Sequence, residues 1–349
     1  MAIKFTEVPK QTYPEWGMRA GTPCYPLEMN FIFLNGGMGD YIAWAQAVLW
    51  LASEATWITG TWVVPDYFLE LATHWLKPYP KWRVTTYSAI KGTPEHDGKP
   101  FRGPVNLQTE SLNATGAHLF TCGWVYFTNK ECAPPGWNHY PVLESADLAA
   151  VELPEAAAAL PAKKYAVITT GVTTNSRKIP GSYWNPIIEH VVSKGLTPVF
   201  LGKETVVTGN PKNIKTKFSE DIRYDLGVDL RDQTTLMQAA AVIDKAALVI
   251  GHDNGLLHLT GCTATPLVFG YNLASTQHRE PPRRSGPTYN VHLTQQDLAC
   301  NFCQSNMNFM IGYVFRECFY SDNKCIDLLF ADDGARWKTK IDLALSEGK

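Results

Sequence analysis

The sequence predicts an α/β fold of two domains, each built on a parallel sheet. Two regions, beginning at Phe31 and at Tyr165, pass from a short apolar run through a glycine-containing loop into an apolar helix. A third region, Leu248–Gly270, has the order strand, polar turn, helix and strand, which is one βαβ unit. At 349 residues the chain is long for one hydrophobic core and comfortable for two.

A domain boundary is predicted in Val151–Lys164, where a short alanine-rich helix precedes a linker bounded by prolines. We therefore expect an N-terminal domain in residues 1–155 and a C-terminal domain with a cysteine-rich tail in residues 160–325. Residues 326–349 are predicted to form a helix that packs back on the first domain.

The first domain is expected to contain a strand at Phe31–Leu34, a glycine-rich turn at Asn35–Asp40 and a helix at Tyr41–Ala55. A second strand and helix follow at Thr61–Pro65 and Tyr67–Leu76. Several of the eleven tryptophans fall in this domain. They are predicted to fill the core, with aromatic platforms for a sugar-like ligand as the alternative.

The turn Asn35–Asp40 is the first candidate site. Its glycines, among them Gly37 and Gly39, allow a ligand to approach the backbone closely, although their spacing is not that of a dinucleotide-binding loop. Asp40 lies in or near the first turn of the following helix, where aspartate is a frequent cap. The alternative role is a general base within hydrogen-bond reach of a substrate hydroxyl.

The second domain repeats this order with a strand at Tyr165–Ile168, a polar loop and a helix at Tyr183–Lys194. The loop crowds hydroxyl groups, a glycine and two cations in front of the helix. The candidate ligand-binding residues here are Thr170, Gly171, Arg177, Lys178 and, after the next strand, Gly202. The two cations would hold a diphosphate, and an ordinary solvated loop is the alternative.

The turn after the strand Ala247–Ile250 is the third candidate site, with Asp253, Asn254, Gly255 and His258. In an open parallel sheet, ligands bind where strands end and helices begin. Asp253 and Asn254 are good N-cap residues, so the first free backbone N–H groups are expected to bind a phosphate. The Asp253 carboxylate would repel a pyrophosphate, which favours a cap or a contact with sugar hydroxyls. A lone helix histidine such as His258 is more often structural.

Four cysteines near the C-terminus, Cys300, Cys303, Cys318 and Cys325, follow the pattern C-x2-C, fourteen residues, then C-x6-C. The first pair has the spacing of a zinc knuckle and the second is wider than most, so a structural zinc site is predicted. Free thiols and a redox pair are the alternatives. The other four cysteines are expected to be plain buried thiols in a reduced compartment.

Charge is sparse, and the formal net charge of −2 argues against a protein that coats nucleic acid. The basic, proline-stiffened loop Gln277–Arg284 is a candidate contact for a phosphorylated acceptor, and a solvated surface loop is the alternative. No run of 18 apolar residues occurs, so no membrane span is expected. The N-terminus lacks the apolar core of a signal peptide, which predicts a cytoplasmic protein.

Three patches of the sequence together resemble the ADP-heptose:lipopolysaccharide heptosyltransferase family, the family 9 glycosyltransferases. They are Gly39-Asp40 before an apolar helix, Arg177-Lys178-Ile179-Pro180 with Trp184, and Asp253-Asn254-Gly255 with His258, Thr265-Pro266 and Phe269-Gly270. The last patch is the most diagnostic. The chain departs from the family at Gln46, Arg177 and Asn254, where proline, lysine and serine or threonine are usual.

The resemblance implies the GT-B fold, in which two Rossmann-like domains with parallel sheets face a central cleft. It implies an inverting glycosyltransferase that needs no metal or other cofactor for catalysis. The enzyme would move a heptose-like sugar from a nucleotide-diphospho-sugar, with an ADP-sugar favoured, to a hydroxyl of a glycan or glycolipid held by the N-terminal domain. Asp40 would be the general base, and Arg177 or Lys178 would hold the diphosphate. Asn254-Gly255 and His258 would complete the donor cradle.

The sequence leaves three alternatives. A sugar-nucleotide epimerase of similar fold would need no second substrate. A glycosyltransferase acting on a hydroxylated nucleic-acid base would need phosphate contacts, which the near-neutral net charge disfavours. A non-catalytic sugar-nucleotide-binding protein would bind the donor and consume none of it.

Overall fold

The structure is a computed structural model that describes residues 27–33, 37–54, 58–91, 101–103, 140–173, 177–203, 216–271, 280–281, 283, 285–294, 297–298 and 324–347. These residues fall into two compact units, one up to Pro141 and one from Val142 onward. No helix within the described ranges combines the length and apolar character that crossing a membrane requires.

The first unit contains a four-stranded parallel sheet in the order β3-β2-β1-β4. Its strands are β1 (Leu27–Phe33), β2 (Ile58–Val64), β3 (Trp82–Thr86) and β4 (Phe101–Gly103). Its helices are α1 (Met38–Glu54), the short η2 (Asp66–Phe68), α2 (Leu69–Leu76) and α3 (Tyr87–Ile90). Parallel neighbours need a crossover, and α1 supplies the one between β1 and β2.

Large aromatic side chains fill the core of the first unit. The ring of Phe68 lies 5.4 Å from that of Tyr41 and 5.8 Å from that of Trp62. Helix α1 is buried without interruption from residue 41 to residue 51, as expected of a helix enclosed by a core. The buried tryptophans of this unit are no more than 7% exposed. They therefore pack the core, as predicted, and do not offer aromatic platforms.

The second unit contains a six-stranded parallel sheet in the order β10-β9-β8-β5-β6-β7. Its strands are β5 (Tyr165–Thr169), β6 (Thr197–Phe200), β7 (Val228–Asp229), β8 (Leu248–His252), β9 (Leu267–Tyr271) and β10 (Thr288–His292). Counted along the chain, this is the doubly wound order 3-2-1-4-5-6. The order reverses between β5 and β8, so the carboxyl ends of these two strands form the crevice in which such folds bind ligands.

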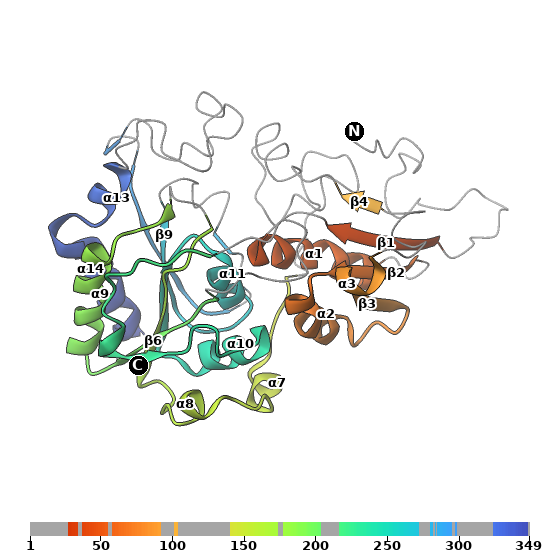
Figure 1. Ribbon diagram of the computed structural model, residues 1–349, viewed down its shortest axis with the longest axis horizontal. Helices are drawn as coiled ribbons and strands as arrows, with labels where there is room; N and C mark the ends of the chain where they lie inside the picture. The colour runs from red at the N-terminus through yellow and green to blue at the C-terminus, as the bar shows by residue number, and fades with distance from the viewer. Residues whose placement is uncertain are drawn as a thin grey trace. The chain divides into compact units, whose positions relative to one another are not determined.

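Helices cover both faces of this sheet, with α9 and α14 on one side and α10 and α11 on the other (Figure 1). The helices of the unit are α7 (Ser145–Ala149), α8 (Glu155–Ala158), α9 (Gly181–Ser193), η5 (Tyr224–Leu226), α10 (Leu236–Lys245), α11 (Gly255–Gly261), α13 (Lys324–Leu329) and α14 (Ala331–Glu347). Aromatic rings pack α9 against α14. The ring centroid of Trp337 in α14 lies 5.3 Å from that of Trp184 in α9 and 5.0 Å from that of Phe330.

Helix α14 belongs to the second unit, which differs from the predicted packing of residues 326–349 on the first domain. Trp337 is fully buried, and a Cβ on Gly270 of β9 would lie 2.3 Å from its ring. Ile341 and Ala344 continue the same buried stripe. The apolar face of α14 is thus used to close one face of the six-stranded sheet.

The division between the units falls near residue 141, earlier than the linker predicted at Val151–Lys164. Helices α7 and α8 are tied to the second unit by polar contacts. The Ser145 hydroxyl donates to Asp244 at 2.8 Å, and the Gln238 amide donates to the Glu152 carbonyl at 2.9 Å. These bonds connect residues about ninety positions apart, which no local sequence pattern reports.

Candidate functional site

The candidate site lies where β5 and β8 end. Asn254, directly after β8, donates through Nδ2 to the backbone oxygen and to Oγ1 of Thr169, both at 3.3 Å. A Cβ on Gly251 would lie 2.0 Å from the same hydroxyl oxygen, so glycine is needed for the strands to approach this closely. The switch point of the sheet is therefore bridged by one amide side chain.

Asn254 also caps helix α11. Its Oδ1 accepts hydrogen bonds from the backbone N–H groups of Leu256 at 3.0 Å and Leu257 at 3.3 Å. These are donors that the sequence analysis expected to face a phosphate, and the protein's own side chain already binds them. Gly255 opens the helix between the cap and these donors. A bound diphosphate would need positive charge from elsewhere in the site.

The N-terminus of α9 is filled in the same way by a residue that sequence reasoning missed. The Asp221 carboxylate accepts from the backbone N–H groups of Gly181 at 2.8 Å and Ser182 at 3.2 Å. The bond from Gly181 contributes most to lowering the pKa of Asp221, and the charge of Lys178 lowers it further. The charge of Lys178 therefore acts on the residue that caps α9, and only the fold reveals this because Asp221 lies forty residues beyond Gly181.

Arg177 brings positive charge to the switch point. Its Nη2 lies 3.5 Å from Oδ2 of Asp253, and the two side chains are 17% and 5% exposed. His258 Nε2 lies 3.9 Å from the other carboxylate oxygen of Asp253. The Asp253 backbone N–H donates to the backbone oxygen of Gly270 at 3.2 Å, which holds the backbone of this residue beside β9. Of the two predicted diphosphate cations, Arg177 is the one that joins the other candidate residues.

Two predicted ligand-binding glycines are required by packing. A Cβ on Gly171 would lie 2.8 Å from the ring of Phe218, and a Cβ on Gly202 would lie 2.6 Å from it. Gly202 also has φ +152°, a conformation that favours glycine. Thr170, between Thr169 and Gly171, is 7% exposed. These positions lie at the carboxyl ends of β5 and β6, and the two glycines make room there for an aromatic ring.

An arginine–aspartate ion pair with short hydrogen bonds lies beside the Phe218 ring, at the end of β7. The Arg231 guanidinium binds Asp229 through Nε at 2.9 Å and Nη2 at 2.7 Å. Its central carbon lies 3.7 Å from the centroid of the Tyr224 ring and 5.0 Å from that of Phe218. This cluster stabilises the edge between β6 and β7 through cation–π packing. The sequence carried no signal for it, because the residues are not arranged in a periodic pattern.

In the first unit, Asp40 performs the capping role that was one of its two predicted roles. Its Oδ2 accepts the backbone N–H of Gly37 at 2.7 Å, in front of α1, in whose first turn Gly39 lies next to Asp40. The pKa values of the phenols of Tyr41 and Tyr67 are raised, mainly by burial and further by the nearby Asp40 charge. This contact does not test the predicted general-base role of Asp40, which stays a prediction.

The loop predicted to contact a phosphorylated substrate is anchored at one of its arginines. Arg283 donates to the carbonyls of Pro287 and Thr263, each at 2.9 Å, and to that of Thr265. Burial lowers the pKa of Arg283 to about 10. This guanidinium therefore joins its loop to the turn between α11 and β9, instead of facing a substrate.

The predicted zinc site falls mostly outside the described residues. Cys300, Cys303 and Cys318 lie there, whereas Cys325 lies in α13 and packs against the core of the second unit. Within the described part of the chain, no group of three or more His, Cys, Asp or Glu residues is placed to hold a metal.

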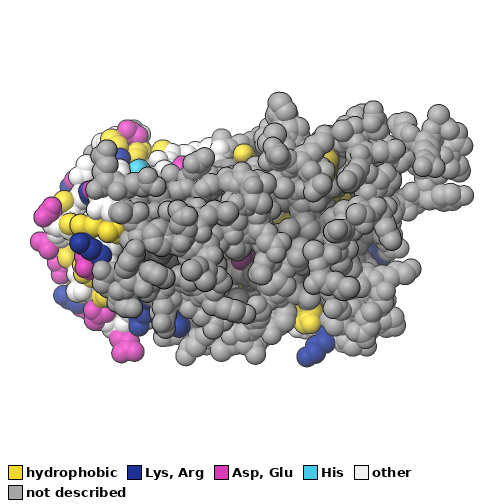
Figure 2. Space-filling model, turned by 90° about the horizontal axis from the view of Figure 1, so that it is seen from above, with side chains coloured by type: hydrophobic (Ala, Val, Ile, Leu, Met, Phe, Trp, Pro, Cys, Tyr) yellow, Lys and Arg dark blue, Asp and Glu magenta, His cyan; other side chains and the backbone are white. Residues whose placement is uncertain are grey.

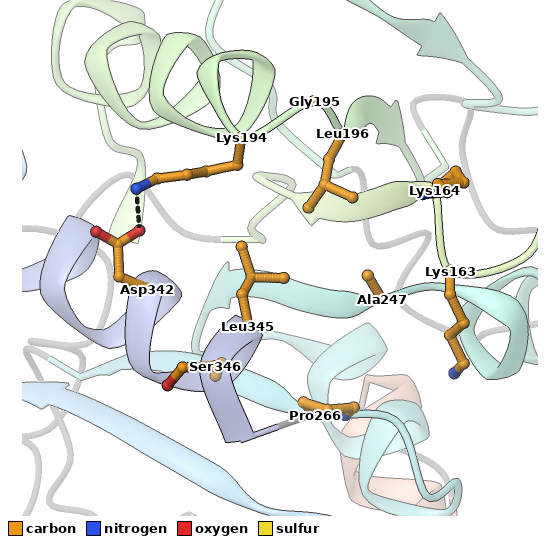
Figure 3. Close-up of a pocket in the computed structure, with 11 residues that line it drawn as sticks. Lys163, Lys164, Lys194, Gly195, Leu196, Ala247, Pro266, Asp342, Leu345 and Ser346 are labelled. Atoms are coloured by element: carbon orange, nitrogen blue, oxygen red, sulfur yellow. Dashed lines mark ion pairs between the residues drawn. The ribbon is translucent and has the colours of Figure 1, made fainter. Parts of the chain in front are cut away.

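A cavity of about 670 Å³ opens at the opposite edge of the second sheet (Figure 3). Lysines and apolar side chains line it, among them Lys163, Lys164, Lys194, Leu196, Ala247 and Leu345. The Lys194 ammonium pairs with Asp342 at 2.8 Å. The Lys163 ammonium donates to the carbonyls of Asp244 at 3.0 Å and Ala246 at 2.8 Å, where α10 ends. Two of its cations are therefore engaged by the protein itself.

The visible described surface of the second unit mixes charges. Figure 2 shows Lys and Arg side chains interspersed with Asp and Glu on the end that carries α9, α13 and α14. Nucleic-acid binding needs a basic face, and this part of the surface does not present one.

Residues 137–305 match the sequence profile described as "Glycosyltransferase family 9 (heptosyltransferase)". Among solved structures, an iron-containing dodecameric glycosyltransferase, TibC, from enterotoxigenic E. coli H10407 is similar at 16% identity and a TM-score of 0.63. The match covers 93% of this chain and 77% of that one. The same heptosyltransferase in complex with ADP-D-β-D-heptose matches over the same shares, at 16% identity and a TM-score of 0.62.

E. coli ADP-heptose lipopolysaccharide heptosyltransferase II is similar at 11% identity and a TM-score of 0.51, over 91% of this chain and 99% of that one. No curated protein sequence matches this chain. At these identities the solved structures show a shared fold. They confirm the predicted fold class, α/β of the GT-B type with parallel sheets.

Proposed function

This chain belongs to glycosyltransferase family 9, and we propose that it transfers a heptose-like sugar from an ADP-sugar to a hydroxyl of a glycan or glycolipid. The observation that carries the proposal is the position of Arg177, held by Asp253 at the switch point of the second sheet. The matched structure that contains ADP-D-β-D-heptose supports this choice of donor, and the match to heptosyltransferase II supports a saccharide acceptor.

At the donor end, we expect the positive charge that binds the diphosphate to come from a side chain and not from a helix N-terminus. The first N–H groups of α9 and α11 are bound by Asp221 and Asn254, so the Arg177 guanidinium is the proposed partner of the diphosphate. Negative charge grows on the leaving phosphate in the transition state, and a fixed cation there stabilises it without a metal. His258 and the backbone at Gly255 are proposed to complete the cradle.

At the acceptor end, Asp40 is proposed as the general base. Its carboxylate takes the proton of the acceptor hydroxyl while the oxygen attacks the anomeric carbon. The bond from that carbon to the diphosphate breaks, and ADP leaves with the electron pair. A single displacement of this kind inverts the configuration at the anomeric carbon.

The test is transfer by the Asp40→Asn variant with ADP-heptose and a lipopolysaccharide-core saccharide. Asparagine keeps an oxygen that accepts the Gly37 N–H, so α1 keeps its cap and only the base is lost. We expect transfer to fall by about 10²–10⁴-fold while ADP-heptose affinity is unchanged. Asp40→Ala is the matched variant, since it removes the cap as well and should also lower the unfolding temperature.

Unchanged turnover in Asp40→Asn would remove Asp40 from the mechanism. A mass-spectrometric screen of ADP-, UDP- and GDP-sugars extends the test to the donor. Donor binding without consumption by any acceptor would favour a non-catalytic binding protein. Consumption of donor alone, without acceptor, would favour an epimerase, and transfer to a hydroxylated base in DNA would change the acceptor class.

The cysteine cluster is proposed to hold a structural metal. Four thiolates suit zinc, and thiolate sets also hold iron, which the TibC structure contains. Metal analysis of the purified protein, with Cys303→Ser as the comparison, distinguishes zinc from iron. Absence of both metals from a folded protein would leave the cysteines as thiols.

A further inference from the structure

A short segment of the second unit, Lys217–Arg223, is bonded to both ends of the loop that carries Arg177, and we call it the strap. At the first end of that loop, just after β5, the backbones of Val172 and Lys217 form an antiparallel bridge. The Val172 N–H donates to the Lys217 oxygen at 3.0 Å, and the Lys217 N–H donates to the Val172 oxygen at 2.6 Å. The strap is therefore tied to the point where the loop leaves the sheet.

The second end of the loop is tied to the strap by side chains. The buried Ser219 hydroxyl donates at 2.6 Å to the carbonyl of Ile179, two residues after Arg177. At the start of α9, the two N–H bonds to the Asp221 carboxylate are joined by a bond of 3.0 Å from the Asn185 amide to the Asp221 carbonyl. One segment thus holds the backbone before and after Arg177.

Helix α9 does not supply this anchoring itself. Its N-cap residue is Pro180, whose side chain has no oxygen with which to cap the helix. A Cβ on Gly181 would collide with the backbone of Asp221, so the strap and the first turn of α9 are in close contact. The start of α9 and the loop before it therefore depend on residues about forty positions away.

The strap in turn is seated on the sheet. The Phe218 ring fills the space left by Gly171 and Gly202, at 2.8 Å and 2.6 Å from the positions that a Cβ would take. Phe218, Ser219 and Ile222 are at most 8% exposed. This seat gives the strap a fixed position relative to the carboxyl ends of β5 and β6.

We propose that the strap is a positioning element of the donor site, and that Ser219 and Phe218 are positioning residues that act through Arg177. The inference rests on the proposed function, in which Arg177 binds the diphosphate. A cation stabilises a leaving group best when it is already in place as the charge develops. The strap provides this by holding the loop at both ends, and neither side chain needs to touch the donor.

The test uses ADP as the probe and two variants that each remove one buried hydroxyl. Ser219→Ala removes the bond to Ile179 without changing the charge of the site. We expect calorimetry to show ADP binding about tenfold weaker in this variant, and kcat/KM for transfer about 10²-fold lower, because a misplaced group loses both binding and catalysis.

The matched control is Tyr165→Phe. Its hydroxyl also donates at 2.6 Å to a backbone carbonyl, that of Val242, but from the amino end of β5. Both variants should lower the unfolding temperature, and only Ser219→Ala should change ADP affinity. If Ser219 had a merely structural role, the two variants would bind ADP equally well at a temperature where both are folded.

A double-variant cycle tests whether the strap acts through Arg177. Ser219→Ala added to Arg177→Gln should weaken ADP binding by less than about twofold beyond Arg177→Gln alone, because the group that the strap positions is already gone. A full, additive loss in that background would overturn the inference.

Unchanged ADP affinity in a folded Ser219→Ala variant would also overturn it. If that variant does not fold, Phe218→Leu decides, since it shrinks the ring seated at Gly171 and Gly202 and should weaken ADP binding in the same way. Unchanged affinity in Phe218→Leu would then count as the contrary result.

Hydrogen exchange at the Gly181 amide, measured without ligand, separates this inference from the proposed function. Exchange should be faster in Ser219→Ala than in the wild type, because the loosened strap protects that amide less. Equal exchange would overturn the strap whether or not ADP binds. Failure of the wild-type protein to bind ADP, with faster exchange in the variant, would instead contradict the proposed donor.

Discussion

The two edges of the six-stranded sheet both carry cations, but the protein uses them differently. At the amino edge, Lys194 is bound to Asp342 at 2.8 Å, and Lys163 is bound to carbonyls where α10 ends. At the carboxyl edge, Arg177 lies 3.5 Å from Asp253. The amino edge has a cavity of about 670 Å³, and the carboxyl edge has the candidate residues at the switch point of the sheet.

The difference follows from helix direction. In a parallel α/β sheet, helices end at the amino edge, where their carbonyls carry partial negative charge and attract lysines. Burial lowers the pKa of Lys163, and the neighbouring Asp244 partly offsets that effect. Helices begin at the carboxyl edge, where their first backbone N–H groups can bind an anion. Here Asp221 and Asn254 already bind N–H groups of α9 and α11, so the proposed diphosphate partner is the Arg177 side chain.

The largest expected effect comes from removing the cation at the carboxyl edge. Arg177→Ala should lower kcat/KM for transfer by about 10²–10³-fold, the usual loss for one group that stabilises a leaving charge. Lys194→Ala, at the amino edge, should leave kcat/KM unchanged. Steady-state kinetics on both variants measure these values. An equal loss of kcat/KM in Lys194→Ala and Arg177→Ala would contradict the proposed difference between the two edges.

The next largest effect is expected on stability, from a change that disturbs the close approach of β5 and β8. Gly251→Ala places a methyl group 2.0 Å from Thr169 Oγ1, so the strands must separate. We expect a loss of about 1–3 kcal/mol in the free energy of unfolding, as for other overpacked cores. Urea denaturation measures this loss.

The matched glycine at the amino edge is Gly195, which is left-handed at φ +75° with no described atom within 4 Å of its Cβ position. Asparagine tolerates that conformation, so Gly195→Asn should cost less than Gly251→Ala. A larger loss in Gly195→Asn would show that packing at the switch point is looser than its distances indicate.

A smaller effect is expected from the cap of α11. Asn254→Ala removes the one oxygen that accepts from both Leu256 and Leu257 and should cost about 0.5–2 kcal/mol in unfolding free energy. Thr235→Ala, which removes the cap of α10, is the control and should cost a similar amount. Only Asn254→Ala should alter ADP affinity, because only that cap lies at the switch point. Calorimetry on both variants tests this.

The smallest effect is the pH response of the amino edge. Burial would raise the pKa of Asp342, but hydrogen bonds from Lys194 and His190 outweigh it and hold that pKa below its ordinary value. The group therefore stabilises the fold above its unfolded pKa of about 3.9, and this contribution is lost as the pH falls through its lower folded pKa. Because the side chain is 45% exposed, solvent screening limits the effect.

We expect Asp342→Asn to be less stable than the wild type at neutral pH by no more than about 1 kcal/mol. The difference should shrink below about pH 4, where the wild-type carboxylate also loses its charge. Thermal unfolding at pH 7 and pH 3 measures both values. A constant difference across this range would mean that the carboxylate charge is not its source.

The positions of strands, helices and candidate loops were predictable from the sequence because their signals are local. Apolar runs, glycine-containing turns and cap residues act within one or two turns of chain, and they located Asp40, Arg177 and Asn254 correctly on the described elements. The family motifs added a fold that the solved structures confirm. The catalytic and substrate-binding roles of these residues stay predictions.

Only the tertiary structure decided how the charges are paired. The sequence offered Arg177 and Lys178 as equivalent cations, but Lys178 acts on Asp221 whereas Arg177 reaches Asp253. These partners lie about forty and seventy-six positions away, so distance along the chain carries no information about them. The same holds for Gly202, which the fold brings against Phe218.

The sequence by itself thus determined which groups are present at each edge of the sheet, because strand and helix order follow from local patterning. The tertiary structure decided the distinction between pairs that meet in short charge-assisted bonds and pairs that approach at a longer distance. That distinction depends on distances of a few tenths of an ångström between remote residues, since charge-assisted bonds form over a narrow range of lengths.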